Sequence, residues 1–401
     1  MSLVLNDVAK FVTSKIELTE IDETNYVSTE NMLPNKGGIT EASSLPDTQT
    51  VREYLPNDIL INNIRPYFKK IWFSNKTGGC SNDIFVLRTK ENYDARFLYY
   101  VLSSDDFFSY VMATAKGTKM PRGDKKAIQN YNVPDFSIEE QIKISSFLSV
   151  IDQKIEINNE INKNLEELIL KIYNSWFVKF ELCDELIDSE LGLIPKGWTI
   201  DYLGSKKSCS IIGSGIDNFD DSKIYIATAD VDNSIITNNE TIITMDEKPS
   251  RANMQPIPKS IWFAKMIDSR KLIMVDDCSE DLLKNYIFST GFCGLKCVDK
   301  YFYYLWTFLL TNAFDTIKNN FCTGTTMQAI NNKDTQLIEF VLPDDKILSQ
   351  FNSIAEPIFK EIYYNNTENK KLQKLRDTLL PKLMSGEIDA CEINNNLTAQ
   401  L

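Results

Sequence analysis

The sequence has no histidine among its 401 residues. This absence excludes triads that use a histidine base, and it removes the usual partner of cysteine in zinc sites. Eight cysteines are present, but no pair has the two-residue spacing typical of zinc or redox motifs. Cys293 and Cys297, with Cys278 upstream, leave a metal site open as an alternative. We favour reduced, mostly buried thiols and expect no metal.

Long apolar runs are also missing. No stretch of about 18 apolar residues occurs, so we expect no transmembrane helix. Residues 1–7 lack the basic start and the apolar core of a signal peptide. We therefore expect a cytoplasmic protein that does not associate with a membrane.

The motifs of several enzyme classes are absent. Gly213-Ser214-Gly215 lacks the third glycine of a dinucleotide fingerprint, and no lysine-containing phosphate loop occurs. No Asn-Pro-Pro-Tyr-like tetrapeptide of a methyltransferase is present. The acidic residues that follow Pro134 have the wrong spacing for a nuclease, and Ser137 with Glu140 instead predicts a capping box at a helix start. We expect no catalytic residue in this chain and no cofactor bound by it.

Acidic residues outnumber basic ones by 56 to 43, which gives a net charge of −13. The excess is local, because residues 181–345 hold 25 acidic and 15 basic side chains, whereas residues 1–137 hold 17 and 16. This balance argues against a generic polyphosphate binder. Binding of DNA through a local basic patch stays open, although tight binding by the chain alone is disfavoured.

The chain contains an internal repeat. Gly117-Thr118-Lys119-Met120 recurs as Gly324-Thr325-Thr326-Met327, and Val133-Pro134-Asp135 corresponds to Leu342-Pro343-Asp344. Fainter matches lie upstream, namely Tyr26–Thr29 with Tyr225–Thr228, Ile71–Phe73 with Ile261–Phe263, and Phe97–Tyr100 with Tyr303–Trp306. Their shared order indicates two unequal copies of one unit.

A long helix is predicted at the end of each copy. Residues 138–176 contain no proline or glycine, and apolar residues recur at spacings of three and four, which is the seam of a coiled coil. The first seam is Ile144, Leu148, Ile151, Ile155, Leu165, Leu168 or Ile169, Ile172 and Trp176. The second seam is Ile354, Ile358, Ile362, Leu372, Leu375, Leu379 and Leu383.

Asparagines interrupt both seams at matching places, Asn158 and Asn162 in the first and Asn365 and Asn369 in the second. A polar residue in a seam costs stability and sets the register of the helices. We expect an antiparallel pair in which the asparagines face each other near the middle. The alternative is two surface helices that never touch.

Short strands and helices are predicted between these features. Strand-like runs are Asp58–Ile61, Ile84–Leu87, Lys223–Ile226 and Leu272–Val275, and helical runs are 94–112 and 299–320. This mixture indicates α+β domains. We expect two globular domains separated by two long antiparallel helices, a coiled-coil spacer of roughly 55 Å at 1.5 Å per residue, with a pseudo-two-fold internal repeat.

Three segments resemble the specificity subunit of type I restriction–modification enzymes. They are residues 140–177, from Glu140-Gln141-Ile142 to Ser175-Trp176-Phe177; residues 191–198, Leu-Gly-Leu-Ile-Pro-Lys-Gly-Trp; and residues 375–388, from Leu375-Arg376-Asp377 to Gly386-Glu387-Ile388. The resemblance covers nearly the whole chain. One departure is that the N-terminus has no Ile-Pro-x-x-Trp-like opening.

The resemblance implies a non-catalytic DNA-reading subunit. Two target-recognition domains, 1–137 and 181–345, would each read one half of a split double-stranded DNA sequence. The central helix 138–180 and the distal helix 346–386 would space these halves and dock two methyltransferase subunits, followed by a tail at 387–401. The methyl donor S-adenosylmethionine is expected on the methyltransferase partner, and an endonuclease or translocase subunit is a further partner that the family allows.

The candidate DNA contacts are basic loops and the repeated motif. Lys and Arg bind phosphates, and Arg also reads guanine with two hydrogen bonds. The first-copy candidates are Arg65, Lys69, Lys116, Thr118, Lys119, Arg122 and Lys125. The second-copy candidates are Arg251, Lys265, Arg270, Lys271, Thr325, Thr326 and Gln328. For all of these, a solvated turn or a structural ion pair is the alternative.

Two other functions stay open at this point. One is a self-contained DNA-modifying enzyme, against which the missing catalytic tetrapeptide argues. The other is a coiled-coil scaffold that reads no sequence.

Overall fold

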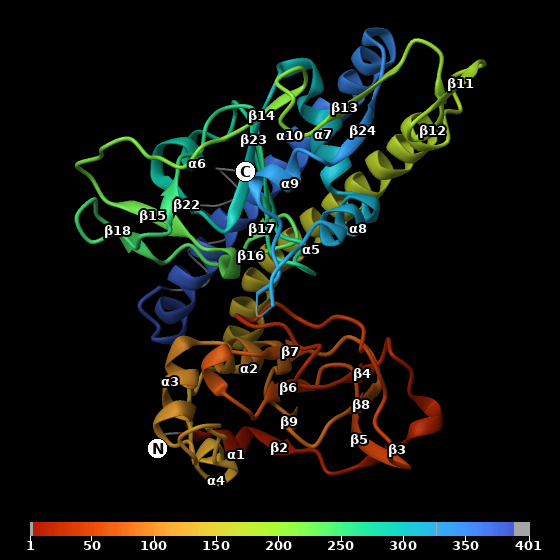
Figure 1. Ribbon diagram of the computed structural model, residues 1–401. Helices are drawn as coiled ribbons and strands as arrows, with labels where there is room; N and C mark the ends of the chain where they lie inside the picture. Colours follow the sequence, from red (N-terminus) through yellow and green to blue (C-terminus); the bar gives the residue numbers. More distant parts are fainter. Residues whose placement is uncertain (1–2, 326, 389–401) are drawn as a thin grey trace. The chain divides into compact units, whose positions relative to one another are not determined.

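The computed structural model describes residues 3–325 and 327–388 and has mixed helix and sheet, which confirms the α+β character (Figure 1). The chain divides into two compact units. Unit 1 contains the described residues up to Asn158 and from Thr367 on, and unit 2 is Asn159–Asn366. Each of the two long helices therefore contributes one segment to each unit. Thr326 and most of the predicted tail lie outside the described residues.

Unit 1 is built on two four-stranded sheets and one short ribbon. The first sheet is antiparallel and has the order β2 (Ala9–Phe11), β9 (Ile84–Thr89), β6 (Ile59–Asn62), β7 (Ile71–Phe73). The second sheet has the order β3 (Lys15–Glu17), β5 (Thr50–Tyr54), β8 (Gly78–Cys80), β4 (Tyr26–Val27). The ribbon pairs β1 (Leu3–Val4) with β10 (Asn132–Val133).

Unit 2 repeats this plan. Its antiparallel sheet has the order β14 (Cys209–Ile211), β23 (Phe292–Cys297), β20 (Ser260–Ala264), β21 (Leu272–Val275). Its second sheet has the order β18 (Ile242–Ile243), β15 (Lys223–Ile226), β22 (Tyr286–Ser289), β19 (Ala252–Met254). The equivalent ribbon pairs β13 (Thr199–Tyr202) with β24 (Glu339–Leu342). Two further small hairpins are β11–β12 (Leu186–Ser189 and Gly192–Pro195) and β16–β17 (Val231–Asp232 and Ile235–Ile236).

The sheet order confirms the four predicted strand runs and corrects one sequence match. Strand β20 is paired on both sides, as β6 is in unit 1, so Ile261–Phe263 corresponds to β6. The match of Ile71–Phe73 with Ile261–Phe263 is therefore wrong, since Ile71–Phe73 is the edge strand β7, whose counterpart is β21. A shared Ile-x-Phe pattern is common to many buried strands and does not identify a partner.

The predicted helical runs 94–112 and 299–320 are wrong as single helices. Each is a pair of helices, α2 (Ala95–Leu102) with α3 (Asp105–Ala113), and α7 (Phe302–Leu309) with α8 (Asn312–Asn320). The break falls where a hydroxyl caps the next helix, because the side chain of Ser104 accepts from the Phe107 amide and that of Thr311 from the Phe314 amide. The shorter helices are α1 (Leu5–Val8), α4 (Lys125–Gln129), α6 (Glu280–Asn285) and α9 (Asn332–Thr335).

The two long helices are α5 (Ile138–Tyr173) and α10 (Asp345–Met384). The predicted capping box opens α5, since the Glu140 amide donates to Ser137 Oγ and the Ser137 amide donates to Glu140 Oε2. The seam of α5 passes through Ile169, which is buried, rather than Leu168, which is 47% exposed. The place of Leu375 in the second seam is wrong, because its side chain is 38% exposed and the neighbouring Arg376 is turned inward.

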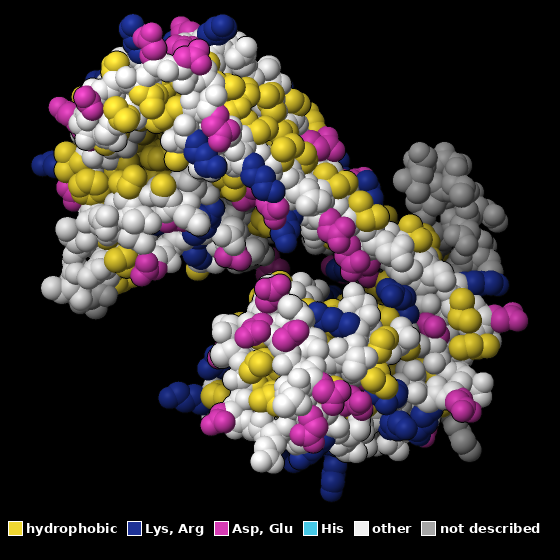
Figure 2. Space-filling view, turned by 90° about the vertical axis from the view of Figure 1, so that its right-hand side faces the viewer, with side chains coloured by type: hydrophobic (Ala, Val, Ile, Leu, Met, Phe, Trp, Pro, Cys, Tyr) yellow, Lys and Arg dark blue, Asp and Glu magenta, His cyan; other side chains and the backbone are white. Residues whose placement is uncertain are grey.

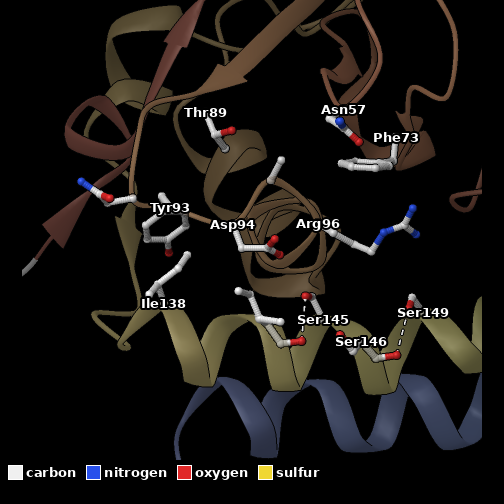
Figure 3. A pocket seen from close by; sticks show the side chains of 13 residues that line it. Asn57, Phe73, Thr89, Tyr93, Asp94, Arg96, Ile138, Ser145, Ser146 and Ser149 are labelled. Atoms are coloured by element: carbon white, nitrogen blue, oxygen red, sulfur yellow. Dashed lines mark hydrogen bonds between the residues drawn. The ribbon is translucent and has the colours of Figure 1, made fainter.

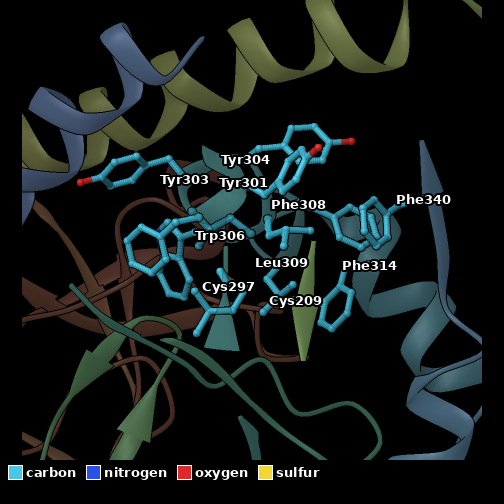
Figure 4. Close-up of a cluster of buried hydrophobic side chains, with 14 of the residues drawn as sticks. Cys209, Cys297, Tyr301, Tyr303, Tyr304, Trp306, Phe308, Leu309, Phe314 and Phe340 are labelled. Carbon is cyan, nitrogen blue, oxygen red and sulfur yellow. The ribbon is translucent and has the colours of Figure 1, made fainter. Parts of the chain in front are cut away.

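Each unit has a core to which both long helices contribute. In unit 1, Ile144 and Leu148 of α5 and Leu380 and Leu383 of α10 join the same buried cluster as the first sheet. In unit 2, Ile169 and Tyr173 of α5 join Phe351 and other residues of α10. Figure 4 shows a portion of that second core, whose aromatic members include Tyr303, Tyr304, Trp306, Phe308, Phe314 and Phe340.

The helix pairing is polar in unit 1 and apolar in unit 2. In unit 1, Arg376 Nη1 lies 2.8 Å from Asp152 Oδ1, and the Tyr100 hydroxyl donates to Asp152 Oδ2 at 2.7 Å. Counting 207 residues along the repeat puts Phe359 in the place of Asp152, and there the Phe359 ring stacks on Tyr303 with centroids 6.0 Å apart. The two halves of the helix pair therefore use different chemistry at equivalent positions.

Hydrogen bonds join the seam asparagines of the two helices. In unit 1, Asn158 Nδ2 donates to Asn369 Oδ1 at 2.9 Å and to Glu368 Oε2 at 2.7 Å. In unit 2, Asn162 Nδ2 donates to Asn366 Oδ1 at 3.1 Å, and Asn365 Nδ2 donates to Asn162 Oδ1 at 2.9 Å. In both units the numbers rise along one helix as they fall along the other, so the paired segments run antiparallel.

Replacing Asn158 and Asn369 together by leucine should raise the free energy of unfolding by about 1 kcal/mol, because both buried partners are removed at once. It should also loosen the register. Cysteines at Lys154 and Glu368, which form an ion pair at 3.2 Å, should cross-link in the parent, whereas a cross-link from position 154 to position 375 should appear only in the leucine variant. Unchanged stability in urea, with only the first cross-link formed, would contradict the prediction.

Candidate nucleic-acid interface

The repeated Gly-Thr-x-Met motif of unit 1 lies at the tip of a hairpin. Lys116 and Arg122 exchange two main-chain hydrogen bonds of 2.9 Å, so residues 117–121 form the turn. Gly117 has φ 91°, a left-handed conformation that favours glycine. Residues 116–120 and Arg122 are all exposed.

The turn between β6 and β7 is attached to this hairpin by main-chain hydrogen bonds. The Arg65 amide donates to the Pro121 carbonyl at 2.8 Å, and the Gly123 amide donates to the Asn63 carbonyl at 3.2 Å. The two basic clusters predicted separately from the sequence, around Arg65 and around Lys119, therefore form one surface. We call this turn (residues 63–70) together with the hairpin (residues 116–122) the unit 1 tip.

Unit 2 has the same arrangement. Thr323 and Ala329, each 207 residues after Lys116 and Arg122, exchange main-chain hydrogen bonds of 3.2 and 3.1 Å. The turn between β20 and β21 is attached to it, because the Ile267 amide donates to the Gln328 carbonyl at 3.0 Å. We call residues 265–271 and 323–329 the unit 2 tip. The constant offset in the sequence is the signal that predicts these equivalent hairpins, whereas nothing in it shows which turn each hairpin contacts.

The predicted cations of unit 1 are partly engaged by acidic neighbours. Lys116 pairs with Asp124, and Arg122 Nη1 lies 3.0 Å from Asp83 Oδ1. The hydrogen bond from Lys116 lowers the pKa of the Asp124 carboxyl. Lys125 lies over the Phe11 ring, 4.5 Å from its centroid.

Arg65, Thr118 and Lys119 have exposed side chains with no ion pair within residues 3–325 and 327–388. They are therefore the candidates of the unit 1 tip with the greatest freedom to contact a ligand. The predicted contact Lys69 lies close by and is held by Asp105.

A chain of ion pairs connects the unit 1 tip to α10. Lys69 Nζ lies 2.9 Å from Asp105 Oδ1, and Lys36 Nζ lies 3.7 Å from the same oxygen and 3.8 Å from Asp377 Oδ1. Hydrogen bonding from Lys69 lowers the pKa of Asp105. Burial lowers the pKa of Lys36, although Asp377 and Asp105 oppose that change. The tip is thus held against the helix that completes its unit.

Most of the predicted cations of unit 2 are used within the fold. Arg270 lies 3.0 Å from Asp315 and also donates to Asn312 and to the Leu310 carbonyl. Lys271 donates to the Val231 carbonyl at 2.8 Å, and Lys265 to the Thr290 carbonyl at 3.2 Å.

The remaining second-copy candidates are exposed and, except for one arginine, uncharged. They are Arg251, Thr325 and Gln328. Thr326 cannot be placed, because it lies outside the described residues. The unit 2 tip therefore offers hydroxyl, amide and methionine groups, with little positive charge.

Positive charge is not gathered into one large patch. On the face drawn in Figure 2, Lys and Arg side chains are dispersed among acidic and uncharged ones. This distribution agrees with the acidic composition and favours short, local contacts to DNA over a continuous basic groove.

An open pocket of about 670 Å³ lies in unit 1 between α5 and the globular region (Figure 3). Its polar lining is used structurally. The Asp94 carboxylate caps α2 by accepting from the Phe97 amide at 2.7 Å, and the Arg96 guanidinium lies 4.6 Å from the Phe73 ring centroid. Ile138 and Ile142 on α5 also line it, and both are exposed.

The cysteines that suggested a metal site lie in the core of unit 2. Burial raises the pKa of Cys293 to about 12 and that of Cys297 well above its ordinary value. Such thiols are protonated at neutral pH and are poor nucleophiles. Within the described residues of the chain, no group of three acidic or cysteine side chains could hold a metal ion, and no helix there is long and apolar enough to cross a membrane.

Comparisons with known proteins agree on one family. A model described as the type I restriction modification DNA specificity domain matches residues 4–167. The type I restriction enzyme MjaIX specificity subunit of Methanocaldococcus jannaschii is 27% identical over 321 residues, which cover 76% of this chain and 71% of that protein. The HindI specificity subunit of Haemophilus influenzae is 22% identical over 455 residues, which cover 96% of this chain and 98% of that one.

A solved structure shows the same fold. The S subunit of a type I restriction–modification system from M. genitalium is similar over 96% of both chains, with 16% identity and a TM-score of 0.52.

Two substitutions should separate structural from ligand-binding cations. Arg270→Ala should lower the free energy of unfolding by about 2 kcal/mol, because Asp315 and the Leu310 carbonyl lose their partner. Lys119→Ala should leave stability unchanged and reduce the salt dependence of DNA binding, by about 0.9 in the slope of log K against log salt for one lost phosphate contact. Urea unfolding and binding titrations with the assembled complex measure the two effects, and the reverse assignment would contradict the prediction.

Proposed function

Because this chain belongs to the specificity-subunit family of type I restriction–modification enzymes, we propose that it reads a two-part double-stranded DNA target, with one tip for each half-site. The observation that carries this proposal is the repeated tip. Both units attach the turn between two equivalent strands to a hairpin that begins 207 residues apart, while the side chains on the two tips differ. A repeated platform with unlike side chains suits two half-sites of different sequence.

The chemistry of the tips supports different modes of contact. In unit 1, Lys119 and Arg65 offer phosphate contacts, and Arg122 offers guanine two hydrogen bonds once it leaves Asp83. In unit 2, Gln328 and Thr325 offer hydrogen bonds to base edges, and Arg251 offers a phosphate contact. Since the unit 2 tip has little positive charge, its binding of DNA depends more on partner subunits.

The long helices are proposed to set the distance between the half-sites. Helix α5 has 36 residues, which at 1.5 Å per residue gives about 54 Å. An antiparallel pair of that length would place two readers roughly one DNA turn or more apart. The hydrogen-bonded asparagines would fix this distance by fixing the register.

The exposed face of α5 is proposed to dock the methyltransferase subunits. Apolar side chains there recur at multiples of about 3.5 residues, namely Ile138, Ile142, Val150, Ile157, Ile161 and Leu168. This second apolar stripe lies outside the buried seam, and an exposed apolar stripe on a helix is typical of a partner interface. Two methyltransferase subunits would supply S-adenosylmethionine and the methylation chemistry, and endonuclease or translocase subunits would join that complex. The chain itself would be non-catalytic.

Exchange of the first globular segment, residues 1–137, for that of another specificity subunit should change one half of the methylated sequence and leave the other half intact. The expected result follows from each tip reading its own half-site. Co-expression with a cognate methyltransferase, followed by mapping of methylated sites, measures it. A change in both halves or in neither would refute the proposal, and methylation by the purified chain with S-adenosylmethionine alone would favour a self-contained enzyme.

Ile142→Asp with Val150→Asp should weaken co-elution with the methyltransferase at least about tenfold, because two charges would enter an apolar contact. Stability should be nearly unchanged, since the two side chains are 49% and 60% exposed. Ile242→Asp on β18 is the matched control, because Ile242 is 69% exposed and lies away from the long helices. Equal behaviour of the variant and the control would exclude this face of α5 as the docking surface.

A further inference from the structure

The exposed large apolar side chains of the first globular segment gather at one place. Among described residues 3–137, they are Tyr67, Phe68 and Met120, which are 48%, 39% and 45% exposed. All three lie on the unit 1 tip, the two aromatics on its turn and the methionine on its hairpin. Exposed apolar groups that collect on one small surface indicate a contact with a ligand.

The turn that carries the aromatics is held rigidly. Arg65 and Lys69, on either side of Pro66–Phe68, have φ of 50° and 49°, which non-glycine residues adopt only where the surroundings impose it. The Asn35 amide donates to the Phe68 carbonyl at 2.8 Å, and the Lys36 amide to the Lys69 carbonyl at 2.9 Å. With the Arg65 amide bound to Pro121, the turn is fixed from both sides. Tyr67 and Phe68, whose ring centroids are 4.7 Å apart, are therefore presented to solvent by a preorganised backbone.

The surroundings of these side chains suit DNA. Arg65, Lys119 and Arg122 are exposed on the same tip and would face phosphates on either side of the apolar groups. In the major groove, the 5-methyl group of thymine is the apolar feature of the base edges, and aromatic side chains contact it. The unit 2 tip also exposes apolar groups, Met266 and Met327, at 37% and 63%, so an apolar element recurs in both tips while the aromatics belong to unit 1.

We infer that Tyr67, Phe68 and Met120 form a binding surface for thymine 5-methyl groups, so that the half-site read by unit 1 contains at least one thymine recognised through its methyl. This inference rests on the proposed function, in which unit 1 reads DNA. It assigns a specificity role to three side chains that carry no charge and that the search for basic residues passes over.

The test replaces thymine by deoxyuridine, which removes only the methyl group. The complex of this chain with its methyltransferase is titrated with duplexes that carry the mapped target, in which each thymine of the unit 1 half-site is replaced in turn. One or more replacements should weaken binding about fourfold, as expected for one methyl-sized group returned to water. Tyr67→Ala with Phe68→Ala should weaken binding to the thymine duplex and abolish the difference between the two duplexes.

Tyr202→Ala on β13 is the matched control, because Tyr202 is also 48% exposed and lies in the other unit. It should keep the full effect of the methyl group. The inference is overturned if no replacement in the unit 1 half-site weakens binding, or if the aromatic double variant keeps the difference.

Loss of co-elution with the methyltransferase in that variant, with the methyl effect intact, would overturn the inference in favour of a protein contact. A complex that binds no DNA sequence preferentially would instead refute the proposed function itself. Near-ultraviolet circular dichroism confirms that each variant is folded.

Discussion

The pairing of the two long helices is the constraint on which both units depend. Unit 1 is closed by a helix segment from the far end of the chain, and the hydrogen bond from Asn158 to Asn369 joins residues 211 positions apart. Unit 2 is likewise completed by helix segments from both sides of its globular region. Neither core is complete without a segment that is distant in sequence, so helix register, core packing and the position of each tip are set together.

The helix pair also explains how the two halves can differ without losing their common plan. The buried Asp152–Arg376 pair in unit 1 and the Phe359–Tyr303 stack in unit 2 occupy equivalent positions. A buried ion pair contributes little net stability compared with apolar packing, but it tolerates few other partners. Unlike contacts at equivalent positions favour the pairing in which each half meets its own partner.

The same division between common backbone and variable side chains holds at the tips. Main-chain hydrogen bonds build each hairpin and attach it to its turn, and they are indifferent to side-chain identity. The exposed side chains are therefore free to differ, and they do. Unit 1 presents Arg65, Lys119 and two aromatic rings, whereas unit 2 presents Gln328, Thr325 and methionines. This arrangement is suited to a protein whose two halves meet different sequences on one scaffold.

Local pattern in the sequence determined the long helices, four of the strands, the capping box at Ser137 and the equivalence of the two hairpins, because periodicity and turn chemistry act over a few residues. It could not decide between Leu375 and Arg376 in the seam, nor reveal that Arg270 is held by Asp315, because both depend on partners distant in the chain. The joining of Arg65 to the Lys119 hairpin is of the same kind. Only the tertiary structure decided it, since main-chain hydrogen bonds between remote loops leave no periodic signature in the residues they connect.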